Sequence, residues 1–536
     1  MKAVQNLFDE LVLKVSTSSE NRHRLLLVII ISLGFALRLH GLLVGEGFRE
    51  FSIKDEVTAY EFALAFLAGE THTWYLGQPA FLDGLAPGPM WTLFWVLLYK
   101  LGAGAPDGAM FWMLTVNTFV IYLVYRFSRT LLGRDYALLT ALLYATGAWP
   151  MFYSTILWNP VPMALLGVLL FIALWQSTQK ERSRSIFLVC LISAIIPQFH
   201  MIGLFYYPAI LLILYLSPVK LNVKWFVSGV IAGTFVYLPY LIGDMLNNWE
   251  NTINMFGERL SGSFGVGKII TTPIGVLSNQ VARWTGYDFE SYREFGDNYF
   301  GSYILLVGVN LVSIIISLIF VASILRKAFS VMRGNWLSPG RIYAKYPAYL
   351  FVGIFLVIPP LLFLLTRHNY GSRYTIIIFP LLFLLPAFFL SELKNVKIKN
   401  IFRFVLSCMI IFNCYLYLVF NLHISNRIEL AEYYAPSFRK MEDTRQQVRK
   451  KVGAKGVIKI VNQDYITNTT EDMYTGGVAL AHYINISEKY SPHDVMPEKE
   501  ITLYLAHIDD SLPENATIVY QTNGMVIFKR NIGNDK

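Results

Sequence analysis

The chain has 536 residues, of which 55% are hydrophobic and only 15% are charged. A soluble globular protein would carry about 25% charged residues, so that class is excluded. The formal net charge of +9 does not indicate a nucleic-acid partner, because most of the excess lies in short loops between apolar segments, where it sets membrane topology. The apolar residues form blocks of about 20, each long enough to cross a bilayer core of about 30 Å. We therefore predict a polytopic α-helical membrane protein.

The basic residues predict the topology. Lys14, Arg22 and Arg24 precede the first apolar segment, and no small-residue cleavage site follows it, which favours an uncleaved anchor with a cytoplasmic N-terminus. Five later basic clusters should also be cytoplasmic: Arg126/Arg129/Arg134, Lys180/Arg182/Arg184, Lys220/Lys224, Arg326/Lys327/Arg333/Arg341/Lys345 and Lys394/Lys397/Lys399/Arg403. About eleven spans fit between them, at residues 25–44, 109–128, 136–153, 161–177, 185–199, 202–217, 225–243, 302–324, 347–366, 375–391 and 402–422. The odd number of spans predicts that the C-terminus is extracytoplasmic. We expect the protein to reside in the inner (plasma) membrane.

Residues 87–103 are also apolar enough to span. Counting them as a span would place Arg126 to Arg134 outside, so we predict a helix lying at the outer interface. This helix belongs to the first outer loop, residues 45–108. Two further outer segments follow, at about 244–301 and in the short turn from Arg367 to Tyr374.

The tail, residues 425–536, has a different composition, with more polar residues and shorter apolar runs. Residues 456–461, 501–505, 516–520 and 525–528 are typical of strands, and residues 427–451 are typical of a helix. Asn523-Gly524 between the last two runs favours a hairpin with a type I′ turn. We predict a small extracytoplasmic α/β domain here, behind a transmembrane catalytic domain formed by residues 1–424.

Asp55 and Glu56 lie about ten residues after the first span, on the predicted far side of the membrane. In one interpretation Asp55 caps a helix of residues 56–68, and Glu56 is favoured by the positive helix end. In the other, Asp55 takes a proton from an acceptor hydroxyl while Lys54 attracts a phosphate. The two are compatible, because a capped carboxylate has a fixed orientation.

Other polar residues lie at the outer ends of predicted spans. Arg367 and Arg373 flank a turn at headgroup depth, where arginine suits bidentate binding of phosphate, although ordinary snorkelling is an alternative. His200 follows Gln198 at the end of a short span. Polar residues buried there are costly and often functional, but a packed, hydrogen-bonded histidine is equally compatible with the sequence.

Several short motifs resemble one family. Arg38-Leu-His-Gly41 followed by Asp55-Glu56-x-x-x-Tyr60 resembles the opening of the GT-C glycosyltransferases, in the branch of protein O-mannosyltransferases and lipid A aminoarabinose transferases. Later elements are similar to others of that family and appear in the same order: Pro87-Gly-Pro89-Met-Trp91, Trp158-Asn159-Pro160, Gln198-Phe-His200 and Arg373-Tyr374. The resemblance covers most of residues 25–391, and the tail carries no such match.

The resemblance implies an inverting transfer of a sugar from a polyprenyl-phosphate donor at the outer membrane face, onto a glycolipid, polysaccharide or protein acceptor. Asp55 would be the base, with Glu56 as a second carboxylate that orients a metal or the acceptor. Donor phosphate would meet Arg367, Arg373 and Lys54, and the substrate-binding residues would be Tyr60, Asn159, His200 and Tyr374. A divalent ion (Mg, Mn or Zn) on Asp55 is a further expectation. Several relatives place an aspartate where this chain has Asn159, which is a weaker cation ligand.

Three rival functions are weighed against this one. A lipid-linked glycan polymerase or ligase would be expected to centre on basic residues in one large loop. A transporter or flippase should show internal repeats and broken helices with charges near the bilayer midplane, whereas the ionisable residues here cluster at the ends of spans. A non-catalytic assembly or receptor protein would use the tail, for which the sequence gives no positive sign.

Overall fold

The structure is a computed structural model that describes residues 19–44, 54–70, 75–77, 86–256, 266–278, 289–333, 343, 347–366, 372–426, 438–452, 457–462, 484–485, 500–507, 516–522 and 525–530. The chain forms two compact units. Unit 1 comprises Met1–Leu39, Leu114–Ser154 and Asn159–Leu418, and unit 2 comprises His40–Met113, Thr155–Trp158 and Val419–Lys536.

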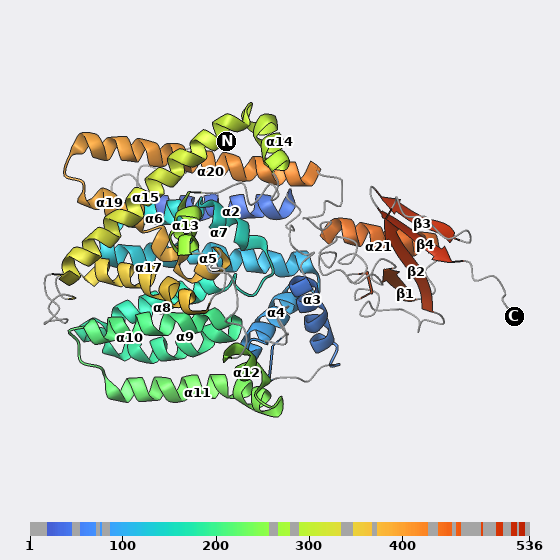
Figure 1. Cartoon of the computed structure of the whole chain (residues 1–536), viewed down its shortest axis with the longest axis horizontal. Coiled ribbons are helices and arrows are strands. Elements are labelled where there is room, and N and C mark those ends of the chain that lie inside the picture. The colour runs from blue at the N-terminus through green and yellow to red at the C-terminus, as the bar shows by residue number, and fades with distance from the viewer. Residues whose placement is uncertain are drawn as a thin grey trace, which may run out of the picture. The chain divides into compact units, whose positions relative to one another are not determined.

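Unit 1 is helical (Figure 1). Its helices are α6 (Arg134–Ala145), α7 (Ala148–Phe152), α8 (Met163–Ser177), α9 (Ile186–Phe199), α10 (Tyr207–Leu216), α11 (Val223–Leu246), α12 (Glu250–Phe256), α13 (Val266–Leu277), α14 (Phe289–Phe300), α15 (Tyr303–Arg333), α17 (Pro347–Thr366), α18 (Phe379–Leu382) and α19 (Leu385–Glu392). Short 3-10 segments are η1 (Tyr153–Thr155), η2 (Lys180–Ser185), η3 (Met201–Tyr206) and η6 (Ser372–Ile378). Three further helices contribute residues to both units: α2 (Ser19–Leu43), α5 (Pro106–Leu132) and α20 (Val396–Asn426).

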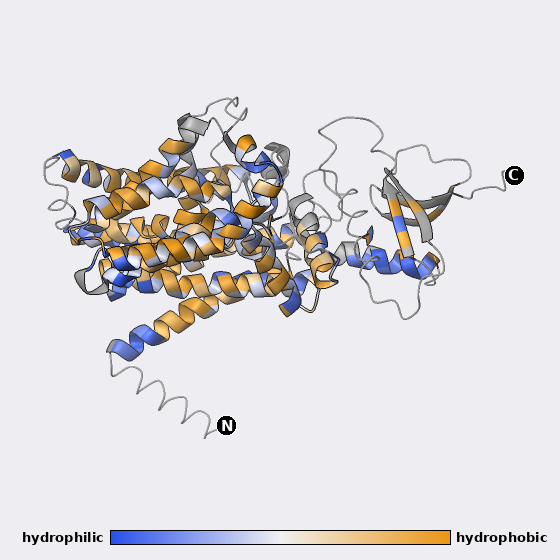
Figure 2. Ribbon diagram, turned by 90° about the horizontal axis from the view of Figure 1, so that it is seen from below, coloured by the Kyte–Doolittle hydropathy of each residue, from blue (hydrophilic) through white to orange (hydrophobic). Residues whose placement is uncertain are grey.

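Every predicted span coincides with helical structure. Six helical segments in the described part of the chain are long and apolar enough to cross a membrane: Glu20–Leu43, Pro106–Leu132, Val223–Leu246, Tyr303–Arg333, Tyr374–Glu392 and Val396–His423. Four shorter apolar helices accompany them: Met163–Ser177, Ser183–Phe199, Met201–Leu216 and Pro347–Leu362. Hydrophobic residues run along the long helices, and hydrophilic residues gather at helix ends and in loops (Figure 2). Helices suit this setting because each satisfies its own backbone polar groups in lipid. The number of crossings and their orientation stay predictions.

Two predicted spans are broken, although the sequence analysis predicted continuous helices at both. The span at 136–153 divides into α6 and α7 at Gly147, whose backbone is extended. A Cβ on Gly147 would lie 2.5 Å from the Phe383 ring, so only glycine allows this close approach. The span at 375–391 divides into η6, α18 and α19, and Pro380 and Pro386 each lie at the start of one of these helices. The breaks themselves carry no charged residue, unlike the ion sites of transporters.

Unit 2 contains the predicted outer helices. The interfacial helix expected at 87–103 is α4 (Pro89–Leu101), which begins with proline at its first turn. It packs against α3 (Lys54–Leu67), with Tyr60 and Tyr99 rings 5.3 Å apart. Both rings are buried. The helices predicted at residues 56–68 and 87–103 are therefore confirmed as α3 and α4. The position of α4 at a membrane surface stays a prediction.

The tail contains the expected mixture of elements. Helix α21 (Phe438–Val452) precedes β1 (Val457–Asn462), β2 (Glu500–His507), β3 (Ala516–Thr522) and β4 (Met525–Arg530). The sheet has the order β1-β2-β4-β3, with β1 parallel to β2 and the other two pairs antiparallel. The predicted β3–β4 pairing is confirmed, and the Asn523-Gly524 turn lies outside the described residues. That residues 425–536 form a separate domain stays a prediction.

Cysteine labelling tests the predicted topology. In a background lacking Cys190, Cys408 and Cys414, we expect Thr517→Cys in exposed β3 to react with a membrane-impermeant thiol reagent in intact cells. Lys397→Cys, an exposed position in a predicted cytoplasmic cluster, is the matched control and should react only after lysis. Labelling of Thr517→Cys only after lysis would contradict an extracytoplasmic tail.

Candidate functional site

Three segments of unit 1 bring predicted site residues together. Asn159 lies in the turn before α8, His200 follows α9, and Tyr374 belongs to η6. The Asn159 side-chain amide donates to the carbonyl of Phe199 at 3.2 Å, and the His200 and Tyr374 rings meet edge-on with centroids 5.7 Å apart. Three of the four residues predicted to bind substrate therefore share one place, although they are far apart in the sequence.

Local backbone structure fixes the His200 ring. Helix α9 ends at Phe199, and His200 is extended, with φ −157° and ψ 124°, at the start of η3. Its Nδ1 accepts the backbone N–H of Ile202 at 3.2 Å. An accepting Nδ1 places the proton of the neutral ring on Nε2, which makes Nε2 a donor. The half-buried imidazole thus has a defined tautomer and orientation, as a substrate-binding group requires.

A second contact anchors the Tyr374 segment. The Tyr206 hydroxyl donates to the Tyr374 carbonyl at 3.0 Å, and Tyr206 is buried at 1% exposure. On the other side, η6 packs against α8 at Gly167, where an added Cβ would clash with the Ile377 carbonyl. The backbone of Arg373, directly before Tyr374, is therefore held beside the His200–Tyr374 pair. The side chain of Arg373, and all of Arg367, lie outside the described residues.

Gln198 has a structural role that its proximity to His200 in sequence did not indicate. Its side chain is 1% exposed, and its Nε2 donates to the Val236 carbonyl at 3.0 Å and the Ala194 carbonyl at 3.4 Å. These bonds tie α9 to α11. Tyr206, by contrast, was not predicted as a site residue. Its hydroxyl nevertheless holds the η6 segment of the candidate site.

The acidic pair lies in unit 2. Helix α3 begins at Lys54, so Asp55 and Glu56 lie inside its first turn, slightly earlier than the helix start predicted at residue 56. Acidic residues in this turn are favoured by the positive end of the helix. The side chains of Lys54, Asp55 and Glu56 lie outside the described residues. Tyr60, about one turn further along α3, is 6% exposed and packs against the Tyr99 ring. Its contact with substrate stays a prediction.

The described residues do not by themselves form a metal site. Within that part of the chain, no group of three or more His, Cys, Asp or Glu could hold an ion. Among the described residues that were predicted as site residues, His200 and Asn159 carry common metal-ligand atoms, and the Nδ1 of His200 already accepts from the N–H of Ile202. One imidazole nitrogen and one amide oxygen are too few for a closed or catalytic site. A metal on Asp55 stays an expectation, because the Asp55 side chain lies outside the described residues.

Arg38 is a buried cation in α2. Its side chain is 0% exposed, and its Nη1 donates to the carbonyls of Gly34 at 2.9 Å and Ala145 at 3.0 Å. Its Nε and Nη2 have no hydrogen-bond partner among the described residues. Buried Tyr144 and Tyr417 lie close enough to interact with it electrostatically. The residue thus ties α2 to the end of α6.

Substitutions at Arg38 test this structural role. We expect Arg38→Ala to lower the free energy of unfolding by about 2–5 kcal/mol, the range for a large buried side chain that leaves a cavity. Arg38→Met should cost much less, because it refills the space and removes a buried charge. Thermal unfolding in detergent measures both. Equal losses for the two variants would show that the hydrogen bonds to Gly34 and Ala145, rather than packing, hold α2.

Comparisons with known proteins support one fold. No protein-family model matches the chain, and a search of curated proteins found no match. Among solved structures, ArnT from Cupriavidus metallidurans in the apo state has a TM-score of 0.57 and 13% sequence identity, covering 94% of this chain and 97% of that chain. ArnT from the same organism bound to undecaprenyl phosphate has a TM-score of 0.54 and 12% sequence identity, covering 95% of this chain and 98% of that chain. An Archaeoglobus fulgidus oligosaccharyltransferase in complex with Zn and sulfate has a TM-score of 0.45 and 13% sequence identity, covering 80% of this chain and 55% of that chain.

The similarity to ArnT shows the fold. The resemblance predicted from short motifs is therefore confirmed as a likeness of fold, which is what 13% sequence identity over nearly the whole of both chains shows. Because 94% of the chain is covered, the similarity extends beyond residues 25–391, which carry the motifs. The tail, in which no motif match was found, is therefore partly included.

Proposed function

We propose that this protein is an integral membrane glycosyltransferase of the GT-C type. It moves one hexosyl or pentosyl group, with inversion, from a polyprenyl-phosphate donor to an extracytoplasmic glycolipid, polysaccharide or protein. The observation that carries the proposal is the similarity, over nearly the whole length of both chains, to ArnT bound to undecaprenyl phosphate. The positive-inside rule supports an active site at the outer face of the inner membrane.

The proposed reaction needs a base on one side of the sugar and cations on the other. The acceptor hydroxyl attacks the anomeric carbon, its proton passes to Asp55, and the bond from that carbon to the phosphate oxygen breaks. Attack opposite the leaving group inverts the configuration. Negative charge grows on the departing phosphate, where Arg367, Arg373 and Lys54 would stabilise it. Glu56 would orient the acceptor.

The geometry of unit 1 supports the placement of the substrate-binding residues. His200 and Tyr374 form a joined aromatic pair, and Asn159 bonds to the residue next to His200. A neutral imidazole with a donor Nε2 suits a sugar hydroxyl or a phosphate oxygen. Arg373 precedes Tyr374, so the same anchored segment would present a cation for the phosphate beside groups for the sugar.

Binding of undecaprenyl phosphate tests the proposal without knowledge of the sugar, because every such donor shares this leaving group. We expect undecaprenyl phosphate to raise the thermal midpoint of the purified protein, since a ligand that binds only the folded state stabilises it. The neutral polyprenol of the same length is the matched control and should act much more weakly. An equal shift with both lipids would mean that the phosphate is not recognised and would contradict the proposal.

A further inference from the structure

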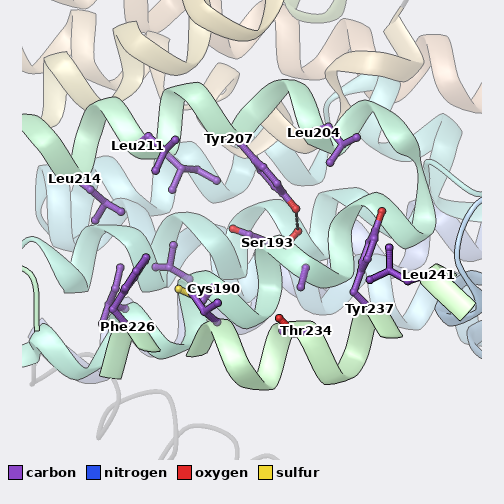
Figure 3. A pocket seen from close by; sticks show the side chains of 16 residues that line it. Cys190, Ser193, Leu204, Tyr207, Leu211, Leu214, Phe226, Thr234, Tyr237 and Leu241 are labelled. Carbon is purple, nitrogen blue, oxygen red and sulfur yellow. Dashed lines mark hydrogen bonds between the residues drawn. The ribbon is translucent and has the colours of Figure 1, made fainter. Parts of the chain in front are cut away.

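A long apolar groove runs between α9, α10 and α11 of unit 1, which lie side by side in Figure 1. Its volume is about 490 Å³, and most of its described lining side chains are apolar, as Figure 3 shows. The Tyr207 hydroxyl points across the groove and donates to the Ser193 carbonyl at 2.7 Å. That bond satisfies the Tyr207 hydroxyl. The other hydroxyls of the lining belong to Ser193, Thr234 and Tyr237, and the remaining lining is largely apolar, so the interior suits a hydrocarbon chain.

Small residues let α11 pack closely on α9 beside the groove. Helix α11 packs against α9 at Gly229 and Gly233, which are spaced as in a Gly-x-x-x-Gly motif that lets membrane helices approach closely. A Cβ on Gly229 would lie 2.9 Å from the backbone of Phe187 in α9. Helix α10 packs instead on α17 and η3. The groove lies between α10 and α11, with α9 contributing to its lining.

One end of the groove is polar and basic. A second hollow of about 240 Å³ shares Ile186, Leu211, Leu214 and Phe226 with the first, so the two are adjoining. Its lining adds three serines, Asn222 and exposed Lys220, and no described lining side chain of either hollow is acidic. At the same end Arg184 lies over the Trp225 ring, 5.8 Å from its centroid. An apolar groove thus leads to a cationic end.

We propose that this groove binds an anionic diacyl glycerophospholipid, with an acyl chain between α10 and α11 and the phosphate at Lys220. Charge complementarity supports this occupant, because basic pockets between membrane helices on the cytoplasmic side suit anionic headgroups. The Lys180/Arg182/Arg184 and Lys220/Lys224 clusters predict that this end is cytoplasmic. Helix α9 is about 21 Å long at 1.5 Å per residue, more than the roughly 15 Å of one leaflet.

This site is distinct from the proposed transfer site. Lys220 lies beyond the C-terminal end of α10, whereas His200 lies at the opposite end of α9, next to η3. Under the predicted topology the two lie at opposite membrane faces. The lipid would cover the groove-lining face of α11, where Val230 and Leu241 are 44% and 36% exposed. The inference does not depend on the identity of the sugar or acceptor.

Native mass spectrometry of the delipidated full-length protein tests the proposal. Phosphatidylglycerol should bind more tightly than phosphatidylcholine with the same acyl chains. Lys220→Gln should weaken phosphatidylglycerol binding about fivefold, the factor for one lysine near an anionic surface, and leave phosphatidylcholine unchanged. Lys397→Gln, an exposed lysine on α20, is the matched control and should change neither. Thr234→Trp, at an exposed position lining the groove, should reduce binding while Lys220 remains.

Three results would overturn the proposal. They are equal affinity for the two phospholipids, unchanged phosphatidylglycerol affinity in Lys220→Gln, and competitive displacement of phosphatidylglycerol by undecaprenyl phosphate, which would make a polyprenyl phosphate the occupant. Lys220→Gln should keep the full thermal response to undecaprenyl phosphate. The failure of this inference and the failure of the proposed function are therefore distinguishable in the same preparation.

Discussion

Replacing Asp55 with asparagine is expected to lower turnover of a polyprenyl-phosphate sugar about 10²–10⁴-fold, the usual loss for a positioned general base. Asparagine keeps the size of the side chain and is tolerated at a helix N-terminus, so α3 should still begin at Lys54. The thermal midpoint should therefore stay close to that of the wild type. Binding of undecaprenyl phosphate should also survive, because the proposed phosphate contacts, Arg367, Arg373 and Lys54, are unchanged in this variant.

Glu56→Gln is the matched control for Asp55→Asn, since it makes the same change at the next position of the same helical turn. Glu56→Gln should lower turnover less than Asp55→Asn does if Glu56 only orients the acceptor. The two losses of turnover should be about equal if both acids hold a metal. Turnover in detergent and thermal stability are measured together. Near wild-type turnover in Asp55→Asn would leave Asp55 with a structural role at the start of α3 and would end the case for this carboxylate as the base.

Arg373→Ala is expected to weaken binding of undecaprenyl phosphate about 10- to 100-fold, the range for losing hydrogen bonds to a charged group. Arg373→Lys should lose less, because it keeps the charge and loses only the bidentate fork. The backbone of Arg373 is anchored through the Tyr206–Tyr374 bond, so the two variants should present their side chains from the same position. Thermal midpoints at increasing undecaprenyl phosphate measure the apparent affinity.

Arg293→Ala provides a control for general loss of positive charge in a predicted outer segment. Arg293 on α14 is mostly exposed and lies 3.6 Å from Asp297 and over the Tyr303 ring, so its contacts are accounted for locally. Its removal should leave affinity for undecaprenyl phosphate unchanged. Normal affinity in a well-expressed Arg373→Ala variant would assign Arg373 to topology or packing instead.

Much of the fold could be predicted because membrane spans depend on local composition. All eleven apolar segments coincide with helices, and the strands of the tail match their β-rich runs. The breaks could not be predicted in the same way. The break at Gly147 depends on the Phe383 ring, more than 200 residues away, and no pattern near residue 147 indicates that contact.

The site shows the same limit. The sequence singled out Asn159, His200 and Tyr374 individually, but the edge-on contact of His200 with Tyr374 joins segments far apart in the chain and follows only from the packing of η6 against α8. Tyr206 was missed because a tyrosine in an apolar segment gives no signal of which carbonyl its hydroxyl will reach. Gln198 was included in a motif because it lies two residues before His200. Its hydrogen bonds to the carbonyls of Val236 and Ala194 show that it serves helix packing.

The most direct test of the central claim is mass spectrometry of glycolipids, envelope glycans and polyprenyl-phosphate sugars from a strain lacking the gene. A transferase that uses a lipid-linked donor predicts two linked changes: one sugar disappears from an acceptor, and the corresponding polyprenyl-phosphate sugar accumulates. The wild-type gene should reverse both changes, and the Asp55→Asn gene should reverse neither. Unchanged glycans together with an unchanged polyprenyl-phosphate pool would contradict the assignment of this protein as a glycosyltransferase.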